Sequence, residues 1–367
     1  GSSRAMLRTL LVIGHLGFIA GLRGGVLVPD RVLEARAQTH RFRSRPVVAS
    51  GNAARSKLRS RLVGVGSCAP PTRVTNVDLE ELVDTTDEWI AQRTGIRSRH
   101  LLAPGETMSE LGSKAASNAL EMAGVDPEEV ELVIFATSSA DDLFGDAAHV
   151  ARLVGATNAV AFDLTAACSG FLFGMNTASQ FLHNGAYKTA LVIGGDALSR
   201  WVDWTDRSTC VLFGDGAGAV VMKAAESDEE SGVLGYEMHS NGAGRPDLNL
   251  VYSGKERDLG GVATVTMGTY DTISMTGKEV YKFATTKVPK VLQEAFANAN
   301  VEADDIDWLV MHQANIRIME TISKKLGIPM DKVIRNVDEY GNTSAGSIPL
   351  ALDEAVRSGK IKKGDTL

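Results

Sequence analysis

The feature of this chain that most constrains its fold is an internal duplication. Residues 119–134 and 295–310 align without a gap at a constant offset of 176 residues, and both read as the end of a helix, an acidic turn and a buried strand. Three aligned pairs are identical: Ala119/Ala295, Ala123/Ala299 and Val125/Val301. Repetition of such a unit predicts two similar halves related by a pseudo-twofold axis, with a shared site between them. A chance likeness between two ordinary helix–strand units is the alternative.

The duplication extends to the next helix. Residues 168–185 and 342–359 have equal lengths, and at their offset of 174 Asn342 takes the position of Cys168. In the first half this helix leads to the apolar segment 190–195 and later to 211–222, whereas the second half reaches Leu367 part-way through the equivalent of 190–195. We therefore expect a further hairpin and a Gly-rich turn to follow Leu367 in the complete protein.

Apolar, strand-like segments alternate with helical ones from Leu62 onward, which indicates an α/β fold. The strands are predicted at residues 62–66, 131–137, 190–194 and 211–222, and the helices at 78–92, 110–123 and after Cys168. With 367 residues, 44% of them hydrophobic, the chain can form one large or two medium domains. We expect an N-terminal half over residues 61–235, a C-terminal half over 236–367, and a segment outside the fold over 1–60.

Residues 1–60 have the composition of a targeting segment. An apolar run over residues 10–22 is too short to span a membrane and suits a signal sequence. Arginines among Ser and Ala follow from Arg41 to Arg61 without an acidic residue, as in organelle transit peptides. We expect a plastid precursor whose mature form lies in the stroma without stable membrane association. A cytoplasmic location and a disordered basic arm are the alternatives.

Charge and cysteine usage exclude several classes of protein. The formal net charge is −7, and because residues 1–61 are strongly basic, the remainder is more acidic still and a poor nucleic-acid binder. The three cysteines are too few and too scattered for a disulfide framework, and no Cys/His spacing suggests a metal site. The Gly-rich stretch 214–218 lacks the spacing of a nucleotide-binding loop and leads into a strand, so we interpret it as close backbone packing.

One cysteine lies where chemistry is expected. The apolar run 159–164 is broken by residues 165–167, and a Gly-punctuated apolar segment of helical length follows Cys168. This places Cys168 between a buried strand and a helix N-terminus, whose free N–H groups and dipole favour a thiolate. Its small neighbours leave room for a substrate carbonyl, and its own N–H is a candidate oxyanion donor. A buried cysteine that acts as a small hydrophobe is the alternative.

Two further polar residues occupy comparable edges. His312 follows the apolar strand 308–310, at the carboxyl end where open α/β sheets bind their ligands. Asn342 lies in a turn of small residues, 341–347, that leads into a helix. Each alone is compatible with a structural role, but together with Cys168 they predict an active site between the two halves.

Four motifs resemble the β-ketoacyl-ACP synthase III family, the thiolase-fold enzymes that start type II fatty-acid synthesis. They are DEWIAQRTGIRSRH (87–100), TAACSGF (165–171), HQANIRI (312–318) and GNTSAGSIP (341–349). The resemblance runs from about Arg61 to Leu367 and implies a thiolase-like αβαβα layered fold from two duplicated halves, and a homodimer. It also implies Cys168, His312 and Asn342 as the catalytic residues.

The resemblance implies a reaction as well. Cys168 is acylated by acetyl-CoA, and malonyl-ACP then loses CO₂ to give a carbanion that attacks the acyl group, so that acetoacetyl-ACP is released. Neutral His312 and the Asn342 amide would hydrogen-bond the oxygen on which charge develops. CoA thioester and phosphopantetheinyl-ACP are the substrates, the acyl carrier protein is the protein partner, and no metal or other cofactor is expected.

Substrate contacts follow from the same resemblance. Trp89 and Arg207 would sandwich the adenine of CoA, Arg93 would meet its phosphates and Asn315 its pantetheine. Phe144 would reach across the dimer and limit the primer pocket. The predicted contacts to the acidic carrier protein are Gln313, Arg317, Lys324 and Lys325, of which the last three form a basic stripe after the HQAN motif.

Other functions stay open at this point. A chalcone-synthase-like or 3-hydroxy-3-methylglutaryl-CoA synthase-like enzyme would share the fold and the nucleophile, although nothing near these motifs offers the glutamate that the latter needs. A non-catalytic protein that binds acyl-CoA or acyl carrier protein would share the fold but form no acyl-enzyme. A structural subunit would show no thiol reactivity at Cys168.

Overall fold

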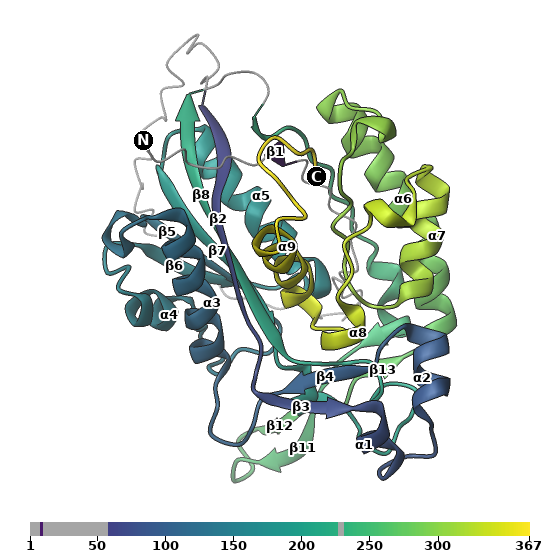
Figure 1. Ribbon diagram of the computed structural model, residues 1–367. Helices are drawn as coiled ribbons and strands as arrows, with labels where there is room; N and C mark the ends of the chain where they lie inside the picture. The colour runs from purple at the N-terminus through teal and green to yellow at the C-terminus, as the bar shows by residue number, and fades with distance from the viewer. Residues whose placement is uncertain (1–7, 10–57, 227–230) are drawn as a thin grey trace, which may run out of the picture.

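The computed structural model describes residues 8–9, 58–226 and 231–367 (Figure 1). The targeting segment predicted over residues 1–60 therefore lies almost wholly outside the described residues. Residues 8–9 are described as the short strand β1 (Arg8–Thr9). The last three residues of the segment, 58–60, begin strand β2 (Leu58–Cys68). They continue the antiparallel pairing of β2 with β8 (Gly216–Glu226), from Leu62 opposite Met222 out to Leu58 opposite Glu226. The folded part thus starts before Arg61.

The described residues build a five-stranded mixed sheet with the strand order β2-β8-β7-β5-β6. The central strand β5 (Leu132–Ala136) runs parallel to both of its neighbours, β7 (Thr189–Asp196) and β6 (Val160–Leu164). β8 runs antiparallel to β7 and to β2. The carboxyl ends of β5, β6 and β7 therefore meet at one edge of the sheet, where such sheets bind ligands.

Alternation along β5 explains how helices cover both faces of this sheet. Val133 and Phe135 pack with α3 and α4, whereas Leu132 and Ile134 pack with α5 and α9. All of β5 is buried, as predicted for residues 131–137, because both faces are covered. The four helices are α3 (Met108–Ala123), α4 (Ala147–Val154), α5 (Gly170–His183) and α9 (Ser347–Arg357).

A third helical layer, α6 (Gly277–Ala299) and α7 (Ile316–Leu326), lies on the far side of α9 from the sheet (Figure 1). Between these layers Leu309 forms a parallel bridge with Val333, and the N–H of Asp307 donates to Thr366 O at 2.9 Å. Residues 307–309 therefore lie between two neighbouring segments, as β5 lies between β6 and β7. The layers therefore follow the expected αβαβα order, although the predicted strand 308–310 is present only as these pairings.

The backbone confirms the duplication. α3 and α6 both end on left-handed residues, Gly124 (φ 59°) and Asn300 (φ 53°), which are 176 positions apart. A short 3₁₀ turn with a capping box of acidic side chains follows each of them, at Pro127–Glu129 and at Ala303–Asp305. Cap and turn thus recur at the predicted offset.

The predicted equivalence of Cys168 and Asn342 is wrong by three residues. α5 and α9 both follow a 3₁₀ turn whose first residue has a positive φ, Ala167 (48°) and Ser344 (49°), and these residues are 177 positions apart. Past the helix ends, Gly185 (φ 74°) and Gly359 (φ 72°) are 174 apart, as predicted. Because α9 has 11 residues and α5 has 14, an alignment that fits the helix ends misplaces their starts. Ala345 is the counterpart of Cys168.

Two other predicted elements differ from the structure. The helix expected over 78–92 is divided into α1 (Asn76–Glu80) and α2 (Asp87–Thr94), because the Thr86 side chain caps a new helix. Leu82, which lies between the two helices, is 59% exposed. The strand expected over 211–222 begins only at Gly216, and the stretch before it is closely packed as interpreted: a Cβ at Gly214 would lie 2.3 Å from Tyr340 O.

The remaining elements are short. The strands are β1 (Arg8–Thr9), β3 (Thr72–Thr75), β4 (Ser98–Leu101), β9 (Gly232–Val233), β10 (Leu248–Asn249), β11 (Tyr252–Asp258), β12 (Thr264–Tyr270) and β13 (Ser274–Met275). They pair as β1–β9, β3–β4, β10–β13 and β11–β12, and helix α8 (Val337–Tyr340) precedes Asn342. None of the helices in the described part of the chain is both long and apolar enough to cross a bilayer.

Arg99 on β4 is a buried cation that holds the segment before β8. Its Nη2 donates to Val211 O at 2.7 Å and its Nη1 to Asn76 Oδ1 at 2.9 Å. We expect Arg99→Ala to lower the free energy of unfolding by about 3–5 kcal/mol in urea denaturation, because buried acceptors lose their donor. Arg97→Ala is the control, since Arg97 is exposed and ion-paired with Asp87, and should cost less than about 1 kcal/mol. Equal losses would contradict this role for Arg99.

Candidate active site

Cys168 lies where β6 gives way to α5, as predicted. The 3₁₀ turn η2 (Ala167–Ser169) links the two elements, and it begins on Ala167 in the left-handed region. Gly170, the first residue of α5, is closely packed, because a Cβ there would lie 3.1 Å from the Cβ of Ala136. The strand before Cys168 is not buried as expected: Val160 is 52% exposed, because β6 is the outermost strand of the sheet.

The Cys168 thiol is not acidic in this environment. Burial, opposed by a hydrogen bond from Ser344 Oγ to Cys168 Sγ (3.5 Å) and assisted by the negative charge of Asp196, raises its pKa to about 11. The expectation that the helix N-terminus favours a thiolate is therefore not met in the resting state, because burial outweighs the helix dipole. The group that attacks must lose its proton as the substrate binds or reacts.

His312 follows residues 307–311 at the edge predicted for it. Its position is fixed by the next residue, since the N–H of Gln313 donates to Ser347 Oγ at 2.6 Å. Both imidazole nitrogens are buried and have no hydrogen-bond partner within the described residues. Burial lowers the pKa of His312 to about 4, so the ring is neutral, as expected, and has one donor and one acceptor available for a substrate.

Asn342 is buried in the turn before α9. Its backbone is held by the segment before β8, because its N–H donates to Leu212 O (2.9 Å) and its carbonyl accepts from the N–H of Gly214 (3.1 Å). Its side-chain Oδ1 accepts from the N–H of Ser344 at 3.0 Å. With the oxygen engaged, the Nδ2 group remains as the donor that a ligand can use, since it makes no hydrogen bond within the described residues.

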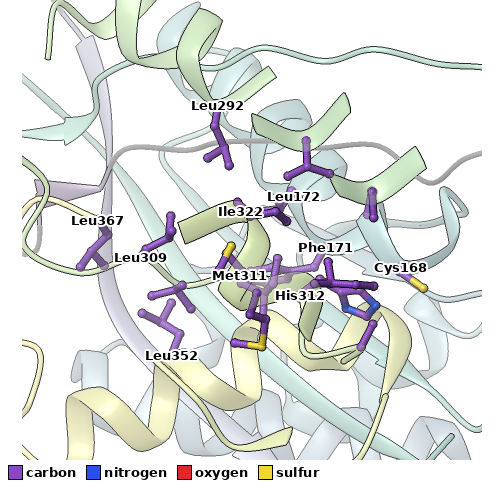
Figure 2. Close-up of a pocket in the computed structure, with 18 of the residues that line it drawn as sticks. Cys168, Phe171, Leu172, Leu292, Leu309, Met311, His312, Ile322, Leu352 and Leu367 are labelled. Carbon is purple, nitrogen blue, oxygen red and sulfur yellow. The ribbon is translucent and has the colours of Figure 1, made fainter. Parts of the chain in front are cut away.

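Cys168, His312 and Asn342 line one open pocket, together with Ser344, so the structure brings the three predicted residues together. Cys168 and His312 also lie at one end of a second, apolar cavity of about 120 Å³ between α5 and the third helical layer (Figure 2). The open pocket and the apolar cavity thus meet at a thiol and a neutral imidazole, with an amide in the open pocket. Such a set of groups can perform acyl transfer.

Trp89 and the two predicted CoA-binding arginines form a cation–π stack. The guanidinium carbons of Arg93 and Arg207 lie 4.4 and 4.8 Å from the Trp89 ring centroid. Arg207 is held there by a hydrogen bond to Asp84 O at 2.6 Å. An aromatic ring inserted between Trp89 and Arg207 needs about 7 Å, since each stacked plane takes about 3.5 Å. The predicted adenine sandwich is therefore closed in this state, and Arg207 must move to admit a base.

The other predicted contacts divide into pocket and surface residues. Asn315 and Arg317 line the open pocket at the start of α7, where Asn315 Nδ2 donates to Arg93 O and Arg317 donates to Gln92 O. Lys324 and Lys325 are exposed in the last turn of α7, and Lys325 Nζ donates to Thr285 O at 2.7 Å. The basic stripe is thus confirmed as helical.

Gln313 contradicts its predicted role. Only 1% of it is exposed, and its amide group binds Met311 O, Ile334 O and the N–H of Asn336. A residue whose hydrogen bonds are all internal cannot contact a carrier protein. Gln313 instead joins the His312 segment to residues 334–336. Phe144, by contrast, is 98% exposed on the loop before α4 and faces the open pocket.

Sequence reasoning missed two clusters. Ser344 and Asp196 contact the Cys168 region, although a serine within GNTSAGS and an aspartate at a strand end are individually unremarkable. Away from the pocket, His239 Nε2 lies 3.3 and 3.0 Å from carboxylate oxygens of Glu237 and Glu294. These three side chains could hold a metal ion, and the sequence could not show this because Glu294 comes from a distant helix.

Burial of His312 predicts a pH-dependent loss of stability. Its folded pKa of about 4 lies below the ordinary value of 6.5, so between these values the unfolded chain binds a proton that the folded protein does not. The free energy of unfolding should therefore fall as the pH drops from 6.5 to 4, by about 3 kcal/mol. Urea denaturation of the protein and of His312→Asn at pH 7 and pH 4 isolates this term. Parallel pH dependence of the two proteins would contradict it.

Comparisons with known proteins point to one family. The family model 3-Oxoacyl-[acyl-carrier-protein (ACP)] synthase III matches residues 162–242, and its C-terminal model matches residues 296–367. Beta-ketoacyl-[acyl-carrier-protein] synthase III of Acaryochloris marina is 55% identical over 306 residues, 83% of this chain and 91% of that protein. The same enzyme of Synechocystis is 52% identical over 84% of this chain and 92% of the relative.

Solved structures agree with these sequences. The crystal structure of 3-oxoacyl-(acyl carrier protein) synthase III from Pseudomonas aeruginosa matches with a TM-score of 0.76 and 36% identity, covering 84% of this chain and 92% of that one. The priming beta-ketosynthase of the R1128 polyketide pathway matches with a TM-score of 0.77 and 35% identity, over 85% and 91% of the two chains.

Proposed function

Because this chain belongs to the β-ketoacyl-ACP synthase III family, the acyltransferases that carry out the initiating condensation of fatty-acid synthesis, we propose that it joins acetyl-CoA to malonyl-ACP at Cys168. The observation that carries the proposal is the meeting of Cys168, His312 and Asn342 in one pocket from three separate parts of the chain. His312 and Asn342 each offer a hydrogen-bond donor that the described residues leave free, and the Cys168 thiol becomes the nucleophile once it loses its proton.

The first half-reaction is acetyl transfer. Cys168 Sγ forms a bond to the acetyl carbon, the carbon–sulfur bond of CoA breaks, and the thiol proton passes to the departing CoA sulfur. Because the resting group is a thiol with a raised pKa, the proton must move together with the attack. His312, whose ring nitrogens are unpaired and neutral, is the group that can carry it.

The second half-reaction is decarboxylative condensation. The bond between the malonyl carboxylate and its α-carbon breaks, CO₂ leaves, and the electron pair moves onto the thioester oxygen as an enolate. His312 N–H and Asn342 Nδ2–H donate to that oxygen. The α-carbon then bonds to the acetyl carbonyl, and Cys168 departs and takes up a proton. Side chains and substrates account for every step, so we propose that no metal or organic cofactor takes part.

We propose CoA and carrier-protein sites on the same rim. Trp89, Arg93 and Asn315 line the open pocket, and Arg207 would swing from Trp89 to receive adenine on the ring face. Lys324, whose side chain makes no hydrogen bond or ion pair within the described residues, and Arg317 offer positive charge to an acidic carrier protein. Lys325, also on α7, keeps its positive charge although its ammonium group donates to Thr285 O of α6.

Trp89→Ala is expected to raise the KM for acetyl-CoA roughly tenfold with little change in kcat, since stacking on a base contributes about 1–3 kcal/mol. The acetyl thioester of pantetheine, which lacks adenine, provides the control: its kcat/KM should be the same for both proteins. A loss with both substrates would mean that Trp89 supports the fold or the thioester site instead of adenine.

We also propose a homodimer and a plastid location. β6 is the outer strand of the sheet, and the nearby loop exposes Leu143 (88%) and Phe144 (98%), which suits Phe144 reaching the primer pocket of a second copy. The acid-free, arginine-rich composition of residues 41–61 supports a plastid protein. Sedimentation as a monomer, or cytoplasmic residence of a reporter fused to residues 1–60, would contradict these proposals.

Incubation with acetyl-CoA and malonyl-ACP tests the proposed reaction. Acetoacetyl-ACP, CoA and CO₂ should form in equal amounts, and heat-inactivated protein should form none. Binding of either substrate without product would favour a non-catalytic acyl-CoA or carrier-binding protein, and a product built from more than one malonyl unit would favour a chalcone-synthase-like enzyme.

A further inference from the structure

Ser344 joins two of the three candidate catalytic residues. Its Oγ–H donates to Cys168 Sγ at 3.5 Å, and its N–H donates to Asn342 Oδ1 at 3.0 Å. Only 2% of it is exposed, and it lies in the left-handed region (φ 49°), which a non-glycine residue adopts at some cost. One residue thus sets both the surroundings of the thiol and the direction of the Asn342 amide.

Asp196 anchors the turn that carries Ser344. It is fully buried at the end of β7, and its Oδ2 accepts from the N–H of Ala345, next to Ser344, at 3.2 Å. Its Oδ1 accepts from Ser138 N–H (2.7 Å) and Ser139 Oγ–H (2.9 Å). These loops come from both halves of the chain, so this carboxylate joins the halves behind the nucleophile.

The Asp196 carboxylate acts on Cys168 without a cation to balance its charge, and burial raises its own pKa. No salt bridge to Asp196 exists within the described residues, and the carboxylate interacts with both Ser344 and Cys168. His312, which lines the same two pockets as Cys168, is neutral, and the first turn of α5 carries no acidic residue. A buried carboxylate without a cation is costly, and such groups are kept where their charge has an effect.

We infer that Ser344 and Asp196 are positioning residues with opposite effects on Cys168: the Ser344 hydroxyl stabilises the thiolate, and the Asp196 charge destabilises it. The inference rests on the proposed role of Cys168 as the nucleophile. Removal of the hydroxyl should make the thiol less reactive, whereas removal of the charge should make it more reactive. Loss of packing alone would not separate the two variants in this way.

The test is the pH dependence of Cys168 alkylation by iodoacetamide, followed by mass spectrometry of the peptide that contains Cys168. Ser344→Ala should slow alkylation about tenfold at a fixed pH below the thiol pKa, the effect of one hydrogen bond to a charged group. Ala167 already occupies the equivalent left-handed position in the first half, so alanine is compatible with this turn. Asp196→Asn should accelerate alkylation about tenfold and shift the midpoint to lower pH.

Asp215→Asn is the matched control. Asp215 is also a fully buried carboxylate, and it accepts from the N–H of Leu102 (2.9 Å) and from Ser199, but it does not act on Cys168. Its removal should lower stability and leave the alkylation midpoint unchanged. If Asp196→Asn does not fold, Ser344→Ala decides alone: unchanged or faster alkylation would overturn the inference. Alkylation needs neither acetyl-CoA nor malonyl-ACP, so the proposed function and this inference can fail separately.

Discussion

Cys168→Ala is expected to lower acetoacetyl-ACP formation by roughly 10³-fold or more, while slow decarboxylation of malonyl-ACP continues. The thiol is the only acceptor for the acetyl group in the proposed mechanism, so without it no acyl-enzyme can form. His312 and Asn342 remain in the pocket and can still stabilise the enolate that forms as CO₂ leaves. Release of CO₂ from labelled malonyl-ACP and formation of acetoacetyl-ACP, measured side by side, separate the two steps.

Cys68→Ala is the matched control for this substitution. Cys68 is also partly buried, and it lies on β2, outside the pocket. Its replacement should leave both measurements within about twofold of the unsubstituted protein. Retention of condensation by Cys168→Ala would contradict the nucleophilic role, and equal loss by both variants would point to a general effect on folding.

Asn342→Asp should show the reciprocal pattern: decarboxylation and condensation fall by roughly 10²–10³-fold, while acetyl transfer to Cys168 is retained. Aspartate keeps the size of asparagine and the oxygen that accepts from the N–H of Ser344. It replaces the Nδ2 donor with a carboxylate oxygen, next to the position where an enolate oxygen develops. The rate of acetyl-enzyme formation, measured by quenched mass spectrometry, is the internal control. A loss of acetyl transfer equal to the loss of condensation would mean that Asn342 shapes the pocket as a whole.

The fold was predictable to the extent that its elements repeat. The offset of 176 between the two halves holds in the structure at the left-handed caps, Gly124 and Asn300, and at the acidic turns after them. Both are local features that a few adjacent residues determine. The offset of 174 failed at the helix start because α9 lacks three residues of α5. A deletion inside a helix leaves both ends recognisable and gives no sign of where the residues were lost.

The residue types at the site could be predicted from the sequence, whereas the protonation of the Cys168 thiol could not. Strand-to-helix and strand-end positions located Cys168 and His312, and the neutral state of His312 is as expected. The acidity of the Cys168 thiol was overestimated, because the helix dipole is visible in a sequence and burial is not. Gln313 was misplaced for the same reason: its neighbours in the chain face the pocket, whereas its own amide is enclosed by Met311, Ile334 and Asn336.

Contacts between distant segments explain the rest. Nothing in the sequence links Asp196 to Ala345, or Arg99 to Val211, although these contacts hold the turns around the pocket. The stacking of Arg207 on Trp89 likewise depends on a loop conformation that brings residues 118 positions apart together. Such contacts follow from the assembled layers, which a pattern of local periodicity does not contain.

The most direct measurement is the intact mass of the unsubstituted protein after incubation with acetyl-CoA, followed by peptide mapping. The proposed function predicts a gain of about 42 Da, one acetyl group, on the peptide that contains Cys168, and its disappearance when malonyl-ACP is added. A folded protein that binds acetyl-CoA but gains no mass, or an acetyl group on another residue, would contradict the claim that Cys168 is the nucleophile of a condensing enzyme.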